Sequence, residues 1–383
     1  MRYGRVMQSI AGAHYNFSLP ESFWTDWQQR VADGQSLQDF KSEQYFWLIR
    51  NFRRRSWLLM YLFGSSPALD ASFVAGRPHS LQRWDEQTWH SPHATSLRMG
   101  DLGYHNNAQS SLNICFNRLD SYIQTLDRAI HTPWPAYEAI GAWREGEPIQ
   151  INTNVLQIEN EYYSAMRPKR TTESGEKPIQ GLTARGVEYV EVRCLDLDPF
   201  ADIGVNAAQI DFLDLFLLDC LLSDSPTIEP VECEILDNNF RDVVAQGRHP
   251  DLQLDRHQSS LPIREYGKRL CERLEVLAEL LDKQEQGHRY RDALAVQQNK
   301  LVNVEQTGSA RALAAMAEHG GGFVGWNLDL AMAQQQGLRQ QGLTDAVTQQ
   351  ERMTAEQSLA DMDALERADN QPFETFLAEY LEP

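Results

Sequence analysis

Hydrophobic and polar residues alternate strictly near the start of the chain. The segment AHYNFSL, residues 13–19, has an apolar side chain at every other position, with His14, Asn16 and Ser18 in between. Because successive side chains of a strand point to opposite faces, this pattern predicts a half-buried strand with one polar face. Pro20 lacks the N–H group that a strand ladder needs and ends the segment.

A second alternating segment, GVEYVEVRCLDLDPF at residues 186–200, carries charge on one face. Tyr189, Glu191 and Arg193 would share that face, whereas the other face would be mostly apolar. Either the carboxylate and the guanidinium neutralise each other, or both face a ligand that needs a negative and a positive group. A metal-bound nucleotide is such a ligand.

Apolar residues spaced three or four apart predict helices elsewhere in the chain. Helices are expected at residues 42–63, 119–131, 207–222 and 308–319, and in the region after residue 263. A strand is expected at 110–117, a hairpin at 148–159, and loops at 76–110 and 171–181. The predicted fold class is therefore α+β: a largely antiparallel sheet with packed helices in a core over residues 1–262, then a helical C-terminal region over residues 263–383.

Composition and charge narrow the class of function. The chain has 383 residues and a formal net charge of −19, which argues against a nucleic-acid partner because phosphate binding needs clustered Lys and Arg. No stretch is apolar enough to span a membrane. The five cysteines are odd in number and form no C-x-x-C pair, a pattern typical of reduced thiols in the cytoplasm. A cytoplasmic enzyme that acts on small molecules fits these properties best.

The polar faces of the two predicted strands supply candidate ligands. The His14 imidazole and the Glu191 carboxylate are ordinary ligands of a divalent cation. The Arg193 guanidinium beside them could bind phosphate oxygens in a bidentate manner. Each group also has a plainer interpretation, as a solvated histidine and as a surface ion pair that contributes little stability. The pattern alone leaves both interpretations open.

A short basic run, RPKR, occupies residues 167–170. Pro168 favours a turn, so a solvated turn is one interpretation. Contact of Arg167, Lys169 and Arg170 with the phosphates of a nucleotide is the other.

Four blocks of the sequence carry a resemblance to a known family. GAHYNFSLP, ATSLRMGDLGY, INTNVLQIENEYYSAMRPKR and GVEYVEVRCLDLDPF resemble segments of the proteobacterial type of glutamate–cysteine ligase. That family is in turn similar to glutamine synthetase, whose H-x-H-x-S and E-x-R strands have the form of HYNFS and EVR. The resemblance implies a glutamine synthetase-like sheet, ATP as co-substrate, and L-glutamate and L-cysteine as substrates. The implied product is γ-glutamylcysteine, formed through γ-glutamyl phosphate in the first step of glutathione biosynthesis.

The resemblance also implies roles for residues of the two strands. His14 and Glu191 would ligate a magnesium ion that touches the nucleotide phosphates. Arg193 would contact the phosphoryl group during its transfer, and Asn16 would line the nucleotide pocket.

Further substrate contacts are implied by the blocks between these strands. Arg98, in TSLR, would face a carboxylate or the phosphorylated intermediate. Tyr104, in DLGY, and Tyr163, in ENEYY, would offer hydroxyl groups to the acceptor cysteine. The alternative for each tyrosine is a core aromatic ring with a satisfied hydroxyl group.

The chain departs from the family at its start. The family's leading segment, which carries an acidic cluster of magnesium ligands, has no counterpart before MRYGRVMQ. We therefore expect a fragment or a truncated product that is monomeric, has little or no activity alone, and has an uncovered sheet edge that lowers its solubility. The alternatives are another carboxylate–amine ligase of the same superfamily and an inactive nucleotide-binding fragment.

Overall fold

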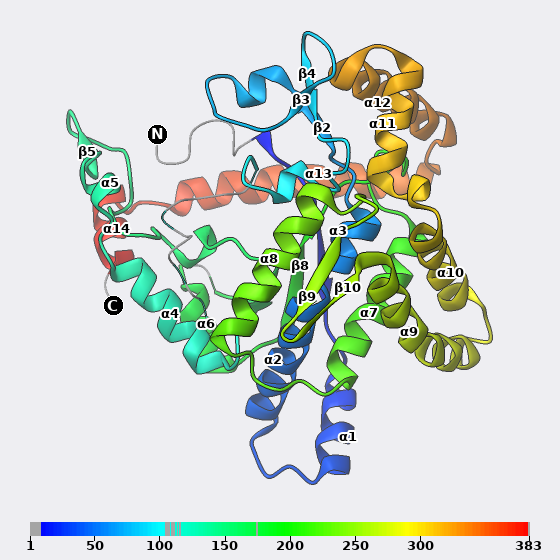
Figure 1. Cartoon of the computed structure of the whole chain (residues 1–383). Helices are drawn as coiled ribbons and strands as arrows, with labels where there is room; N and C mark the ends of the chain where they lie inside the picture. The colour runs from blue at the N-terminus through cyan, green and yellow to red at the C-terminus, as the bar shows by residue number, and fades with distance from the viewer. Residues whose placement is uncertain are drawn as a thin grey trace. The chain divides into compact units, whose positions relative to one another are not determined.

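The structure is a computed structural model and describes residues 9–103, 108, 112, 114, 116–173 and 175–381 (Figure 1). The helices are α1 Glu21–Val31, α2 Leu37–Arg55, α3 Trp57–Phe63, α4 Leu119–His131, α5 Pro135–Glu138, α6 Pro178–Arg185, α7 Ala207–Leu222, α8 Pro230–Gln246, α9 Ile263–Glu285, α10 Arg289–Val302, α11 Gly308–His319, α12 Gly322–Gln341, α13 Asp345–Ala368 and α14 Phe373–Leu381. The strands are β1 Ala13–Phe17, β2 Ala68–Asp70, β3 Gln82–Arg83, β4 Thr88–His90, β5 Trp143–Arg144, β6 Glu147–Pro148, β7 Met166–Lys169, β8 Tyr189–Leu195, β9 Gln253–Arg256 and β10 Ser259–Pro262.

A three-stranded antiparallel sheet in the order β1-β8-β7 joins the two segments predicted from alternation. Residues along β8 are alternately half-buried and buried, so that Val190 and Val192 lie in the core. The predicted α+β class, with an antiparallel sheet and packed helices, is confirmed.

The entry into β8 depends on a glycine. Gly186 ends α6 with a φ of +66°, which side-chain-bearing residues rarely adopt. A Cβ atom there would also lie 2.5 Å from the hydroxyl oxygen of Ser42. That hydroxyl group instead accepts a hydrogen bond from the backbone N–H of Val187 at 3.0 Å, which fixes the start of the strand against α2.

The buried face of the sheet is covered by helices. The C-terminal half of α2 and all of α3 are buried, and the two helices pack against β7 and β8. The single helix predicted over residues 42–63 is thus two helices, which meet at Ser56. On the β1 side, Tyr15 donates a hydrogen bond of 2.6 Å to Asp214 of α7. The predicted helices at 119–131, 207–222 and 308–319 are confirmed with these bounds.

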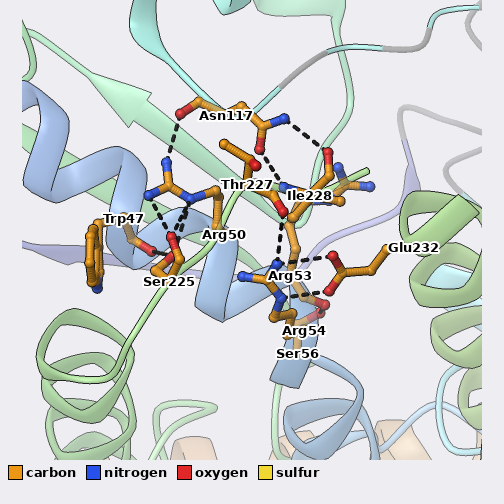
Figure 2. A network of polar contacts seen from close by, with 10 residues as sticks. All are labelled: Trp47, Arg50, Arg53, Arg54, Ser56, Asn117, Ser225, Thr227, Ile228 and Glu232. Atoms are coloured by element: carbon orange, nitrogen blue, oxygen red, sulfur yellow. Dashed lines mark hydrogen bonds and ion pairs between the residues drawn. The ribbon is translucent and has the colours of Figure 1, made fainter. Parts of the chain in front are cut away.

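Arginines of α2 fix the segment that leads into α8 (Figure 2). The buried Arg50 guanidinium donates to the backbone oxygens of Ser225 and Asn117 at 2.9 and 2.6 Å. Arg54 binds both carboxylate oxygens of Glu232, at 2.6 and 3.0 Å. A bidentate ion pair of this kind specifies orientation as well as energy, so α2 and α8 are held in one register.

Several predicted elements are corrected by the structure. The first three residues of the RPKR run, Arg167 to Lys169, lie in strand β7 rather than in a turn, and Arg170 follows the strand. The hairpin predicted at 148–159 lies at 143–148 as β5 and β6, and the expected loop over 76–110 contains β3 and β4 of a small sheet. The loop expected at 171–181 gives way to α6 at Pro178. Half of the residues of the strand predicted at 110–117 lie outside the described residues, and the described half, residues 112, 114, 116 and 117, is not in a strand.

The chain divides into two compact units, residues 1–327 and 328–383. From Ile263 to Leu381 the described elements are all helical, but a functional boundary between residues 262 and 263 stays a prediction. No described helix combines the length and the apolar character needed to cross a bilayer. The four cysteines that the structure describes are free thiols.

Candidate functional site

Polar side chains from all three strands of the central sheet form a row. Asn16 of β1 and Arg167 of β7 are each paired with Glu191 of β8 in the strand register. Directly paired residues of adjacent strands point to the same face. The sheet therefore brings together three residues that the sequence placed far apart.

His14 joins this row as a neighbour of Glu191. A register shift between Ala13 and Tyr15 interrupts the ladder at this position, and His14 Nδ1 lies 3.1 Å from Glu191 Oε1. Burial and the nearby Arg193 lower the pKa of His14, and the opposing effect of Glu191 is smaller. The imidazole is therefore neutral at pH 7 and can offer a lone pair.

The second oxygen of Glu191 has no hydrogen bond although it is buried. The nearest cations are more distant than a hydrogen bond: Arg193 Nη1 lies 3.7 Å away and Lys169 Nζ lies 3.9 Å away. A buried carboxylate oxygen without a hydrogen bond is costly unless a ligand occupies it. Glu191 and Arg193 thus form a loose ion pair and do not fully neutralise each other.

Two guanidinium groups stand close together beside Glu191. Burial and the charge of Arg193 lower the pKa of Arg167 to about 10. The Nε groups of Arg167 and Arg193 are buried and make no hydrogen bond. Burial likewise lowers the pKa of Lys169, with contributions from both arginines. Concentrated positive charge with unused N–H donors is suited to binding the oxygens of phosphates.

Arg98 and Tyr163 lie next to the side chains around Glu191. The Arg193 guanidinium lies 5.6 Å from the centre of the Tyr163 ring, and the Tyr163 hydroxyl group is 3.4 Å from the sulfur of Met99. Arg98 precedes Met99 in a short 3-10 helix and is near enough to His14 to help lower its pKa. A Cβ atom on Gly12 would lie 2.5 Å from Arg98 Nη1, so the missing side chain makes room for this guanidinium.

Not every predicted site residue joins the group. Arg170 Nη1 donates to the backbone oxygen of Arg185, and Arg170 Nε lies 3.7 Å from Glu188, the residue before β8, rather than beside Glu191. Asn16, by contrast, belongs to the row through its pairing with Glu191, and its side chain is exposed. Tyr104 lies outside the described residues.

The fit to a divalent cation rests on His14 and Glu191. A neutral imidazole beside a buried carboxylate oxygen without a hydrogen bond is a suitable donor pair. Within the part of the chain that the structure describes, no cluster of three or more His, Cys, Asp or Glu could hold a metal ion. Water and nucleotide phosphates would have to complete the coordination, which is the usual way in which magnesium is bound.

Sequence reasoning missed Asp196, which follows β8 directly. Its carboxylate accepts a hydrogen bond of 2.7 Å from Arg98 Nε, and both side chains are buried. The only signal in the sequence is an acidic residue at the end of an apolar strand, and its partners are distant along the chain.

Two clefts adjoin the site. One, of about 300 Å³, is lined by Met99, Tyr163 and Phe240 among others, but His14, Glu191 and Arg193 do not line it. The other, of about 170 Å³, is lined in part by Arg98 and Asp196. Arg167, Glu191 and Arg193 line neither cleft, so the candidate site rests on the arrangement of its side chains rather than on either cavity.

Comparison with known proteins places these features in a family. Residues 1–243 match the family described as glutamate-cysteine ligase. The chain is similar to the glutamate–cysteine ligase of Hahella chejuensis, with 53% identity over 386 residues, 99% of this chain and 73% of that protein. It is also similar to the enzyme of Azotobacter vinelandii, with 52% identity over 383 residues, 99% of this chain and 72% of that protein.

Solved structures give the same result for the fold. A crystal structure of glutamate–cysteine ligase from Francisella tularensis in complex with AMP matches with a TM-score of 0.89 and 33% identity, covering 99% of this chain and 74% of that one. A bifunctional glutathione synthetase from Pasteurella multocida has a TM-score of 0.65 at 22% identity, over 87% of this chain and 37% of that one. The second similarity concerns the fold alone.

Proposed function

Because this chain belongs to the glutamate–cysteine ligase family, we propose that it joins L-glutamate to L-cysteine at the expense of ATP and forms γ-glutamylcysteine, as in the first step of glutathione biosynthesis. The observation that carries the proposal is the high identity to named ligases over nearly the whole chain. The convergence of His14, Glu191 and Arg193 on one sheet face supports it.

The reaction consists of two transfers. The γ-carboxylate of glutamate attacks the terminal phosphorus of ATP, which gives γ-glutamyl phosphate and ADP. The amine of cysteine then attacks the acyl carbon, phosphate leaves, and an amide bond forms. Both steps develop negative charge on phosphoryl oxygens, so fixed cations around them lower the barrier.

In this proposal, the basic residues of the sheet bind the phosphates of ATP. Arg193 contacts the transferred phosphoryl group, since its buried Nε has no protein partner among the described residues. Arg167 and Lys169 bind the remaining phosphate oxygens. Burial lowers the pKa of both side chains more than any other cause, so phosphate oxygens would stabilise two charges that water solvates poorly. Asn16 lies beside them on the nucleotide side.

The amino-acid substrates lie toward Arg98 and Tyr163. Arg98 binds a substrate carboxylate, and the Tyr163 hydroxyl group, with that of Tyr104, contacts the acceptor cysteine. The position of Tyr163 between Arg193 and Met99 supports this assignment.

His14 and Glu191 would hold a magnesium ion. When bound, the ion supplies positive charge that neutralises the phosphate oxygens during transfer. The ion pair partners of Glu191 are loose enough to leave its Oε2 atom available.

A direct assay tests the proposal. We expect the purified chain to bind magnesium-ATP, L-glutamate and L-cysteine in calorimetric titrations, and any γ-glutamylcysteine that forms, detected by mass spectrometry, to require all three. The little or no activity expected for the chain alone stays a prediction, which the same assay tests. The Glu191→Gln variant keeps the size of the side chain but removes its charge, and should lose nucleotide binding in magnesium by roughly tenfold or more.

The outcomes separate the alternatives. Phosphate release with another amine but not with cysteine would indicate a different ligase of the superfamily. Binding of ATP without turnover would indicate a nucleotide-binding chain that does not catalyse the reaction alone, and absence of ligand binding would overturn the proposal. A cytoplasmic location and a monomeric state belong to the same proposal, and cell fractionation and sedimentation test them.

A further inference from the structure

Asp196 is the centre of a buried hydrogen-bond network. Its Oδ1 atom accepts from Arg98 Nε at 2.7 Å and from the Ser96 hydroxyl group at 2.9 Å. Its Oδ2 atom accepts from the Ser66 hydroxyl group at 2.7 Å and from the backbone N–H of Ser65 at 2.8 Å. The side chains of Asp196 and Arg98 are only 3% and 7% exposed.

This network fixes the orientation of the Arg98 guanidinium. An arginine side chain is long and flexible, but its guanidinium is a rigid plane with N–H donors in fixed directions. Fixing Nε therefore fixes the direction of the terminal N–H groups. The Asp196 carboxylate is itself fixed in place, because it accepts three further hydrogen bonds from Ser65, Ser66 and Ser96.

The position of Asp196 links Arg98 to the phosphate-binding strand. Asp196 comes directly after β8, three residues beyond Arg193. The strand that carries Glu191 and Arg193 thus also determines where the Arg98 guanidinium lies. Gly12, just before β1, closes the other side of the guanidinium, as its Cα hydrogen leaves space that a Cβ would fill.

We propose that Asp196 is a positioning residue for the ligation: it holds Arg98 in the orientation in which the guanidinium binds a carboxylate of an amino-acid substrate. This inference rests on the proposed function through the role of Arg98. Asp196 does not touch the substrates itself.

Asp196→Asn tests the inference, because the amide keeps the shape of the carboxylate but loses the charge that holds Arg98. Its one oxygen can accept from only one of the two donor pairs, Arg98 with Ser96 or Ser65 with Ser66. We expect the dissociation constant and the KM of one amino-acid substrate to rise roughly tenfold. We expect kcat and the dissociation constant of a non-hydrolysable ATP analogue to change less than about twofold. A purely structural role would instead weaken all ligands together or lower the amount of folded protein.

Asp198→Asn is the matched control. Asp198 is also buried in the loop after β8, but its carboxylate accepts from the backbone of Phe200 at 2.9 Å and from the side chain of Asn206 at 3.3 Å. The Asp198→Asn variant should bind both amino-acid substrates with unchanged dissociation constants. If Asp196→Asn shows no cooperative thermal unfolding transition, the variant has not folded and Ser96→Ala replaces it. Ser96→Ala removes one of the donors that hold the carboxylate, and should raise the dissociation constant of the same amino-acid substrate roughly threefold.

The results distinguish the two proposals. A wild-type chain that binds both amino acids, with variants that bind them equally well, would overturn the positioning role alone. A wild-type chain that binds neither amino acid would overturn the proposed function and this inference with it.

Discussion

At the scale of single residues, the site depends on a histidine that stays neutral. Burial and Arg193 lower the pKa of His14 below its usual 6.5, whereas its hydrogen bond and attraction to Glu191 act in the other direction. The imidazole can therefore serve as a ligand at pH 7 without competition from a proton. An alternating strand pattern could place His14 beside a charged face, but it could not show which neighbour it meets.

The titration of His14 is a measurable consequence. Its NMR resonance, assigned by its loss in His14→Gln, should titrate with a midpoint below 6.5. Because the folded-state pKa is lowered, the folded protein binds this proton less readily than the unfolded chain, so the contribution of His14 to stability is full above pH 6.5 and falls as the pH drops through the folded pKa.

Glu191→Gln provides the control for this titration. It removes the carboxylate that raises the pKa of His14, so the midpoint should move further down. A midpoint at or above 6.5 in the unaltered protein would contradict the role of burial and Arg193.

At the scale of elements, β1 and β8 could be predicted because each alternates over at least five residues. β7 could not, because it is four residues long and contains Pro168. Proline is tolerated in a strand at the edge of a sheet, and among the residues that the structure describes β7 is such an edge strand, paired with β8 alone. The basic residues Arg167 and Lys169 belong to the site because β7 pairs with β8 in the register that places Arg167 opposite Glu191.

Asp196 escaped prediction for a similar reason. Its contacts are with four residues that lie between 98 and 131 positions earlier in the chain: Ser65, Ser66, Ser96 and Arg98. Local patterns report periodicity and turn chemistry, and carry no information on which distant loops meet at the end of a strand.

The arginine contacts of α2 lead to a prediction about stability. Arg50→Met keeps an unbranched aliphatic chain but removes the guanidinium that donates to Ser225 and Asn117 (Figure 2). Their acceptor oxygens would lose charged donors, so the free energy of unfolding should fall by about 3 kcal/mol in urea titrations followed by circular dichroism.

Arg30→Met is the matched control for Arg50→Met. Arg30 lies exposed in the last turn of α1, and its loss should change the free energy of unfolding by less than about 0.5 kcal/mol. Equal effects of the two changes would show that the α2 contacts contribute no specific stability.

At the scale of the whole molecule, the two compact units differ in how they are stabilised. The unit of residues 1–327 contains a continuous apolar core that includes the helices behind the sheet. In the unit of residues 328–383, Leu377 is the one buried side chain among the described residues. Helix formation without burial is marginal, because most helical stability in proteins comes from packing.

Hydrogen exchange on the full chain tests this difference. None of the residues of α13 is buried, whereas nine residues of α7 are. Local opening of α13 should therefore cost little free energy, and its amides should exchange at least about a thousandfold faster than those of α7 in peptide-resolved mass spectrometry. Equal protection of the two helices at high protein concentration, lost on dilution, would mean that self-association covers the apolar side chains of α13 such as Leu359, Met362 and Leu365. Equal protection that persists on dilution would contradict the prediction, because α13 would then be stable without burial.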